Sequence, residues 1–188
     1  ILKWSALGDV VIASAVMEDI ARAFPAAKIH LNTLPNCAGL FAHDPRFVEV
    51  WSIDVRSRRY RWANSLAWLK KARAGRYDLV IDLQRSDHSG LLLTLLCLGG
   101  GAPRVRVGNR GGFPYTHQPV LRMSGAHALP TMQSVLQAIG IPTNTTHPVL
   151  YPPPDRLAAV EALMRQHGLV DGRYVVLLPG SAAAHPLK

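Results

Sequence analysis

Asp9 is the first residue whose type and position could do chemistry. It follows Gly8 at the turn between a short apolar run, residues 1–4, and a helical pattern. In open parallel sheets, ligands bind beyond the carboxyl ends of the strands, so this carboxylate could act as a general base on a substrate hydroxyl. Gly8 would let a substrate approach the backbone closely. The alternative is that Asp9 only caps the helix, which is the commoner role on local sequence alone.

A run of arginines follows later in the chain and could bind anions. Guanidinium groups hold carboxylates and phosphates in a forked geometry, so the run could grip a multiply anionic sugar. Arginines interleaved with Tyr60 and Trp62 could also stack on nucleic acid, or they could form a solvated helix entrance. The residues themselves leave these alternatives open. The run consists of Arg56, Arg58, Arg59 and Arg61.

A second strand-to-helix turn carries polar side chains after the apolar run at residues 77–83. Four of them could contact a sugar, namely Gln84, Arg85, Asp87 and His88. Ser86 could cap the helix that follows. Packing is the simpler explanation for Asp82, and Arg85 could simply pair with Asp87.

Gly180 and Ser181 follow an apolar run, residues 174–178, that predicts a final strand. A small-residue turn there exposes backbone N–H groups that can hold a diphosphate, and Lys188 could add a point charge. An ordinary turn is the simpler interpretation. The eight histidines are scattered, with no HExxH motif and no grouping with cysteine, so we expect no metal site.

Strand and helix patterns alternate along the chain. The expected strands are residues 1–4, 28–33, 47–51, 77–83 and 104–107. The expected helices are residues 12–24, a segment with Trp62, Leu66 and Leu69 on one face, residues 86–98 and residues 129–139. This alternation predicts an α/β layered domain with a largely parallel sheet.

Composition and charge bound the function. The chain has 188 residues, 48% of them apolar, and a formal charge of +9, which predicts a packed core and an anionic partner. Cys37 and Cys97 suit a reducing compartment.

Residues 141–154, rich in Pro and Thr, are expected to link a domain at residues 1–140 to a second one that begins at 155–188. We expect a piece of a longer protein, because residue 1 already lies in a strand.

Four blocks together resemble glycosyltransferase family 9, which includes the ADP-heptose:lipopolysaccharide heptosyltransferases. They are ILKWSALGDVVIASAV, FPAAKIHLNT, YDLVIDLQ followed by RSDHSGLLLTLL, and VVLLPGS with a later lysine. The resemblance implies the amino-terminal half of a GT-B type enzyme with two Rossmann domains. Residues 1–140 would then bind the acceptor, and residues 155–188 would begin a truncated donor-binding domain. The chain departs from the family at Ala15, where proline is frequent, and at residues 85–88, which replace a glycine-containing turn.

The resemblance implies an inverting, metal-independent transfer of a sugar, such as heptose from ADP-heptose, to the lipopolysaccharide core. Asp9 matches the family's catalytic base, and no cofactor is expected. The acceptor site that we expect comprises Gly8, Arg56, Arg58, Arg59, Arg61, Gln84, Arg85, His88, Arg110 and His127. The resemblance implies that its arginine run, residues 56–61, binds the anionic Kdo sugars and that His127 matches a histidine often found in the family. The donor phosphate site comprises Gly180, Ser181 and Lys188.

The resemblance also implies a cytoplasmic protein, peripheral on the inner membrane of a Gram-negative bacterium, with a nucleotide sugar and a lipopolysaccharide core acceptor as partners. The fragment alone is expected to be inactive, because the donor site needs the other half. The alternative is a non-catalytic module that binds anionic glycolipid or nucleic acid. We expect no nucleic-acid partner, because the arginines lie on loops of an α/β domain and match no known reader module.

Overall fold

The computed structural model describes residues 1–57, 59–84, 86–119 and 127–177. They fall into two compact units, Ile1–Tyr151 and Pro152–Lys188. The first unit contains a parallel sheet in the order β3-β2-β1-β4-β5. Its strands are β1 Leu2–Lys3, β2 His30–Thr33, β3 Glu49–Trp51, β4 Leu79–Asp82 and β5 Val105–Gly108. The predicted α/β, Rossmann-like fold class is confirmed.

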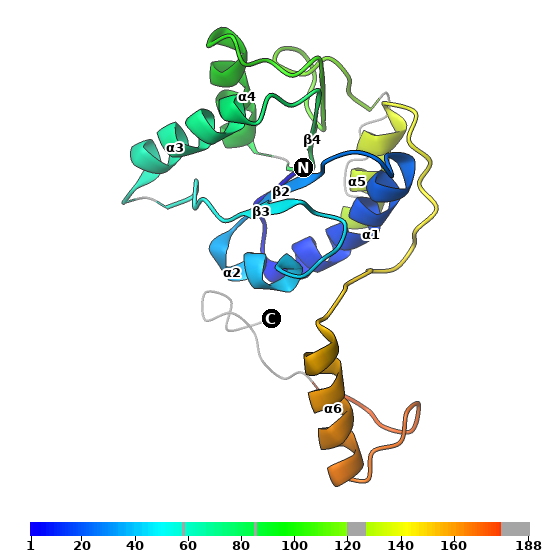
Figure 1. The fold of residues 1–188 in the computed structure, drawn as a ribbon. Helices are drawn as coiled ribbons and strands as arrows, with labels where there is room; N and C mark the ends of the chain where they lie inside the picture. The colour runs from blue at the N-terminus through cyan, green and yellow to red at the C-terminus, as the bar shows by residue number, and fades with distance from the viewer. Residues whose placement is uncertain (58, 85, 120–126, 178–188) are drawn as a thin grey trace. The chain divides into compact units, whose positions relative to one another are not determined.

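Helices cover both faces of this sheet (Figure 1). α1 and α5 share one apolar cluster with the sheet, and α3 and α4 share the other. The helices of the first unit are α1 Leu7–Ala23, α2 Pro35–Ala38, the 3₁₀ turn η1 Gly39–Phe41, α3 Arg61–Ala74, α4 Asp87–Leu98 and α5 Ala128–Gln137. The result is a three-layer α/β unit, as expected when helices connect parallel strands.

The register of the central strand decides which turns meet. Leu2 of β1 pairs with Asn32 on one side and with Asp82 on the other. β1 and β4 therefore end side by side. The turn that leads from β1 into α1 and the turn that leads from β4 into α4 consequently lie at the same edge of the sheet, where ligands bind in such folds.

Helix α3 buries a different face from the one that its sequence pattern suggests. Trp62 and Leu66 are 80% and 67% exposed, whereas Trp68 and Leu69 are buried. The indole N–H of Trp68 donates a 2.6 Å hydrogen bond to the buried Asn32 side chain, which draws that ring into the core. The predicted grouping of Trp62, Leu66 and Leu69 thus shares a helix face, but only its last member enters the core.

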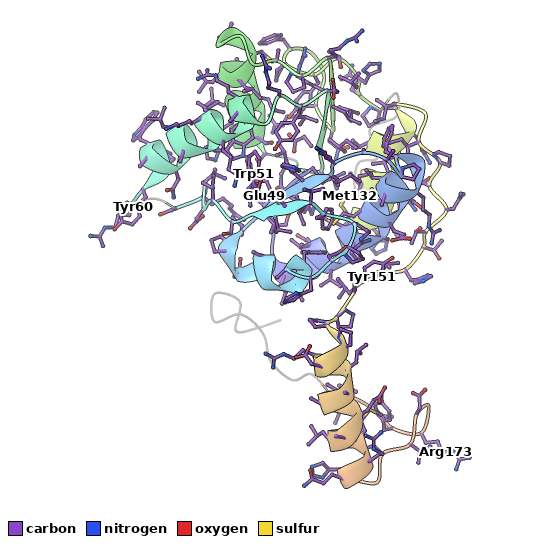
Figure 2. All side chains as sticks on the ribbon, viewed as in Figure 1. Glu49, Trp51, Tyr60, Met132, Tyr151 and Arg173 are labelled. Carbon is purple, nitrogen blue, oxygen red and sulfur yellow. The ribbon has the colours of Figure 1, made fainter. Side chains whose placement is uncertain are left out.

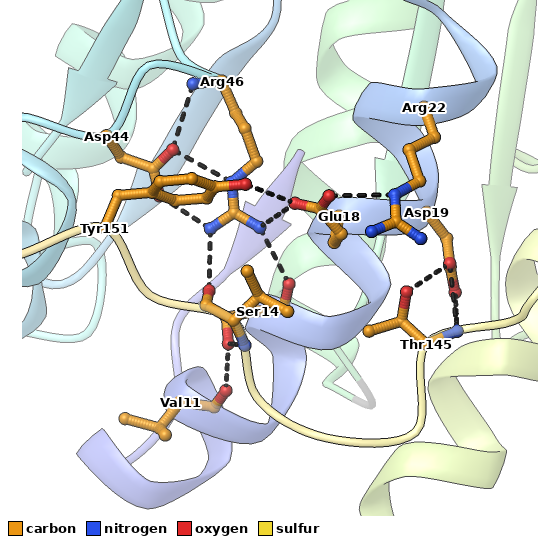
Figure 3. Close-up of polar contacts among 10 residues, drawn as sticks. Val11, Ser14, Glu18, Asp19, Arg22, Asp44, Arg46, Thr145 and Tyr151 are labelled. Carbon is orange, nitrogen blue, oxygen red and sulfur yellow. Dashed lines mark hydrogen bonds and ion pairs between the residues drawn. The ribbon is translucent and has the colours of Figure 1, made fainter.

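The chain after α5 is held against α1 by a buried group that we call the Arg46 cluster, which comprises Glu18, Asp44, Arg46 and Tyr151 (Figure 3). The Arg46 guanidinium donates to Asp44 at 2.6 Å and to Glu18 at 3.2 Å. It also donates to two backbone carbonyls, one of them that of Val149. The Tyr151 hydroxyl donates to Glu18, and its ring lies 4.8 Å from the guanidinium carbon. Each buried charge in the cluster therefore has partners.

The second unit contains α6, Pro154–Gln166, which has no buried residues. Residues 174–177 form neither helix nor strand, so the strand predicted at residues 174–178 is not present in its described part. A strand needs a neighbour for its backbone groups. The described residues of this unit supply none. Among the helices described, none is long and apolar enough to cross a membrane.

Candidate functional site

A cavity of about 1450 Å³ opens at the sheet edge where β1 and β4 end. Lys3 and Trp4 come from the end of β1, and Asp9 comes from the first turn of α1. Gln84 contributes from the turn after β4. Helices α3 and α4 supply a further, largely apolar part of the lining, which includes Trp62. The topology thus brings together the two turns that the sequence singles out.

The Asp9 carboxylate is exposed at this cavity and is not used as a helix cap. Helix α1 has Ala6 in the capping position, and no side chain accepts a hydrogen bond from its first turn. The capping alternative for Asp9 is therefore wrong for the described structure. A carboxylate in the first turn is still favoured by the helix dipole. Gly8 beside it is also exposed, with no atom within 4 Å of where a Cβ would stand.

Lys3 is a buried cation in the lining of the same cavity. The residue is 5% exposed, and its ammonium donates one 3.3 Å hydrogen bond, to the Leu83 carbonyl. Burial lowers the pKa of Lys3 from its usual value of 10.5, and the charges of Asp9 and Asp82 oppose that change. An ammonium has three donors, so Lys3 keeps donor capacity that its described neighbours do not use.

Two carboxamide groups add further unused donors. Gln84 is 7% exposed, and its Nε2 atom has no hydrogen-bond partner among the described residues. The Nδ2 atom of Asn109 also has no hydrogen-bond partner among the described residues, and Gln84 and Asn109 both line the cavity. A buried donor without a partner costs free energy, so such groups in a cavity indicate a ligand or ordered water that completes them.

Asp82 positions one of these amides. It is fully buried and accepts hydrogen bonds from the Tyr115 hydroxyl at 2.5 Å and from the Gln84 backbone N–H at 2.8 Å. Burial raises the pKa of Asp82, against the lowering effect of these hydrogen bonds. The structure therefore assigns Asp82 to packing, as the sequence suggests, and to holding the turn that carries Gln84.

The arginine run contributes two members to the cavity. Arg56 and Arg61 line it, and the Arg56 guanidinium donates to the Trp4 carbonyl at 3.2 Å. Arg59 is exposed, with its guanidinium carbon 5.3 Å from the ring of Tyr60. Arg58 lies outside the described residues. The cavity therefore has a cationic side, made by Arg56, Arg61 and Lys3.

His88 lines the cavity on α4, where Ser86 caps the helix by accepting a hydrogen bond from the Ser89 N–H. Burial, with a contribution from the Arg61 charge, lowers the pKa of His88 below its usual value. A neutral imidazole can donate one hydrogen bond and accept another. His88 is thus suited to contact hydroxyl groups near neutral pH.

The remaining predicted acceptor residues contribute less. Arg110 forms an ion pair with Asp87 at the start of α4, and its side chain is not part of the cavity lining. His127 is exposed and immediately precedes α5, whose first residue Ala128 does line the cavity. Arg85 and the three donor-site residues, Gly180, Ser181 and Lys188, lie outside the described residues.

Sequence reasoning missed Lys3 and Asn109. The sequence signal for Lys3 was a charged residue inside an apolar run that ends at the ligand-binding edge of the sheet. Asn109 follows directly after β5, so it stands at the carboxyl end of a third strand. Within the described residues no group of His, Cys, Asp or Glu is placed to hold a metal ion.

Solved structures share this α/β fold. The first is the crystal structure of a glycosyltransferase family 9 protein from Veillonella parvula, with a TM-score of 0.71 and 18% sequence identity over 95% of this chain and 54% of that chain. Two Escherichia coli enzymes are also similar. Heptosyltransferase WaaC, solved with ADP-2-deoxy-2-fluoro heptose, has a TM-score of 0.59 and 21% identity over 78% of this chain and 50% of that chain. ADP-heptose LPS heptosyltransferase II has a TM-score of 0.55 and 18% identity, over 92% of this chain and 51% of that chain.

These comparisons confirm at the level of the fold the resemblance seen in the sequence. The chain spans about half the length of each of these structures. No protein-family model and no curated protein matches the sequence. At 18% to 21% identity, the likeness establishes a shared architecture, and the chemistry has to be argued from the cavity.

Proposed function

We propose that this chain is the acceptor-binding half of an inverting GT-B type glycosyltransferase. The observation that supports this most strongly is the position of Asp9. Its carboxylate lies at the cavity where β1 and β4 end, and it caps no helix. A carboxylate at such an edge, in the same cavity lining as hydrogen-bond donors that lack partners among the described residues, suits a base that removes a proton from a bound hydroxyl.

In this proposal, Asp9 takes the proton of an acceptor hydroxyl while the hydroxyl oxygen attacks the anomeric carbon of a nucleotide sugar. The new bond between oxygen and carbon forms as the bond from that carbon to the diphosphate breaks, and the diphosphate leaves with the electron pair. A single displacement inverts the anomeric configuration. Gly180, Ser181 and Lys188 are proposed to stabilise the leaving charge, with no metal and no cofactor.

The cavity's chemistry favours an anionic acceptor. Lys3 offers ammonium donors, and Gln84 and Asn109 offer amide donors that no described residue uses. Arg56 and Arg61 add guanidinium groups. Such donors suit a sugar that bears a carboxylate or phosphate. With the fold's likeness to heptosyltransferases, this supports the lipopolysaccharide core as acceptor and ADP-heptose as donor, at the cytoplasmic face of the inner membrane.

The test uses the full-length protein with a panel of nucleotide sugars, including ADP-heptose, and a Kdo-terminated lipid acceptor. We expect transfer from one donor, an inverted anomeric configuration in the product by NMR, and unchanged rates after treatment with EDTA. Residues 1–188 alone should bind acceptor without turnover. Loss of transfer in EDTA would contradict the metal-independent mechanism. Binding of the acceptor without transfer from any donor would instead establish a non-catalytic glycolipid-binding module.

A further inference from the structure

Trp62 is the one tryptophan of the chain whose indole N–H makes no hydrogen bond within the described residues. The other three, Trp4, Trp51 and Trp68, are at most 5% exposed, and each donates its indole N–H to a side chain. Those three rings are held in the structure by packing and by these bonds. Trp62 is 80% exposed, so its ring and its N–H are both available to a bound molecule.

The ring of Trp62 is placed where a ligand of the cavity can reach it. Trp62 stands in the first turn of α3 and lines the cavity that also contains Asp9. Tyr60, two residues earlier, is exposed too, but it is not part of that lining. Figure 2 shows Tyr60 projecting away from the sheet at this end of the helix. Of these two exposed aromatic residues, Trp62 is therefore the one that can contact a molecule in the cavity.

Polar side chains accompany Trp62 in the lining. The Arg61 guanidinium carbon is 5.5 Å from the centroid of the Trp62 ring. Ser65 lines the cavity three residues after Trp62, so the two side chains share a helix face. His88 of α4 lies close enough to Arg61 for that charge to contribute to its lowered pKa. A hydroxyl, an imidazole and a guanidinium can all form hydrogen bonds with sugar hydroxyls.

The cavity is large and has two chemically different parts. Its volume of about 1450 Å³ exceeds the roughly 300–1,000 Å³ of ordinary small-molecule sites. One part carries the donors of Lys3, Gln84 and Asn109, which stand at the ends of the adjacent strands β1, β4 and β5. We call it the strand-end subsite. The other part, which we call the helix subsite, comes from α3 and α4 and consists of Arg61, Trp62, Ser65 and His88.

We propose that the helix subsite binds a second sugar of the acceptor, with the indole of Trp62 stacked on the C–H face of a pyranose ring. This inference rests on the proposed function, in which the strand-end subsite holds the sugar that receives the transfer. A pyranose has an apolar face of C–H groups and a rim of hydroxyls, so it suits an aromatic ring accompanied by hydrogen-bonding side chains. Trp62 would then select acceptors of two or more sugars over a monosaccharide.

An apolar group attached to the acceptor is the competing occupant. Leu66 and Leu91 are exposed and also line the cavity, so apolar area is present near the helix subsite. An apolar group would, however, cover Arg61, Ser65 and His88 without forming hydrogen bonds with them, which costs free energy. A sugar ring meets the aromatic face and these polar groups together.

The test measures binding to the full-length protein by isothermal titration calorimetry, without nucleotide sugar. The probes are free Kdo and a disaccharide in which Kdo is linked to glucose. Because glucose is uncharged and neither probe carries a lipid, any added affinity comes from the second ring. We expect the disaccharide to bind about ten-fold more tightly than Kdo. Trp62→Ala should remove most of this advantage and affect the binding of Kdo little.

Three further substitutions identify the cause of the effect. Trp62→Phe keeps a flat aromatic face and should keep part of the advantage, whereas Trp62→Leu keeps only apolar area and should lose it. Tyr60→Ala is the matched control, because it removes an exposed aromatic ring outside the cavity lining and should change neither affinity. Equal affinity of the Phe and Leu variants for the disaccharide would indicate an apolar occupant and overturn the proposal.

Tryptophan fluorescence locates the second sugar independently. Since the other indoles are at most 5% exposed, quenching by acrylamide reports mainly on Trp62. The disaccharide should protect the emission from acrylamide more than Kdo does. Disaccharide binding with unchanged quenching would place the second sugar elsewhere and contradict the proposal. Equal affinities of the wild type for the two probes would overturn the second subsite alone, whereas failure of both probes to bind would contradict the proposed function as well.

Discussion

Helix α1 serves two polar regions that differ in how completely their groups are paired. In the Arg46 cluster, the guanidinium is 5% exposed and donates hydrogen bonds to two carboxylates and two carbonyls. The Tyr151 hydroxyl donates a further hydrogen bond to Glu18. At the other end of the helix, Asp9 has no capping bond, Lys3 makes one long bond, and the amides of Gln84 and Asn109 are unpartnered among the described residues.

The difference separates structure from function. Buried polar groups in a settled core are nearly always paired, because an unpaired one costs free energy. The Arg46 cluster meets that rule and fixes the chain after α5 to α1. The cavity departs from that rule, because several polar groups in its lining lack partners among the described residues. We therefore assign the first region to stability and the second to binding, and substitutions in the two regions should affect different measurements.

The largest expected effect is on turnover. If the proposed function holds, Asp9→Asn in the full-length protein should lower kcat by about 100-fold to 10,000-fold, the usual contribution of a general base. Asp155→Asn is a matched control, because Asp155 also stands in the first turn of a helix, α6. Either change should cost the same small stability, about 0.3–1 kcal/mol, through the helix dipole. Normal turnover in Asp9→Asn would remove the carboxylate from the mechanism.

The next effect is on stability. Arg46→Met should lower the free energy of unfolding by about 3–5 kcal/mol, because it leaves the Asp44 and Glu18 carboxylates buried without their cation. Urea denaturation followed by circular dichroism measures this change. The control is Arg22→Met, which removes the other, 63% exposed partner of Glu18 and should cost less than about 1 kcal/mol. Equal effects would refute the distinction between the two arginines.

The smallest expected effect is on kcat/KM for the acceptor, and it distinguishes the cavity from the Arg46 cluster. Lys3→Met should lower kcat/KM for the acceptor by about ten-fold, which corresponds to one charge-assisted hydrogen bond. Unlike Arg46→Met, it should not lower stability at neutral pH, because the cost of burying the Lys3 charge outweighs the compensation from the charges of Asp9 and Asp82. A marked loss of stability with unchanged kcat/KM would make Lys3 a structural residue.

The pH dependence of Lys3→Met sharpens this prediction. The pKa of Lys3 is lower in the folded protein than the usual 10.5 of the unfolded chain, so the folded state binds this proton less tightly. Above about pH 10.5, Lys3 is neutral in both the folded and the unfolded protein, and its titration does not lower the free energy of unfolding. As the pH falls through the folded pKa, the unfolded chain binds the proton more tightly than the folded protein does, and the folded protein loses stability. The methionine variant should gain stability relative to wild type at neutral pH, and the gain should shrink at alkaline pH.

The sequence predicts the sheet and the position of Asp9 well, because both depend on local patterns. Apolar runs that alternate with helical patterns specify parallel strands, and a Gly-Asp pair after the first run falls at their carboxyl edge. The role of Lys3 does not follow from such patterns. A lysine in a strand usually extends towards solvent, and only the pairing of β1 with β4 shows that this one is enclosed.

Two other features depend on contacts between distant residues. Helical periodicity shows that Trp62, Leu66 and Leu69 share a face but not which face enters the core, and that choice follows from the bond between Trp68 and Asn32, 36 residues apart. The Arg46 cluster joins Glu18 to Tyr151, 133 positions apart, so no local pattern indicates it. Segments that do not depend on such contacts, such as the helix after Ser86, were placed correctly.

The most direct test is whether an acidic sugar accepts hydrogen bonds from the unpartnered amides of the cavity. Side-chain amide resonances of Gln84 and Asn109, assigned by substitution in the ¹⁵N-labelled full-length protein, would be followed during titration with free Kdo and with a neutral sugar. We expect Kdo to shift both resonances, the neutral sugar to shift them little, and Lys3→Met to weaken the response. Binding of Kdo that leaves both amides unchanged would contradict the central claim.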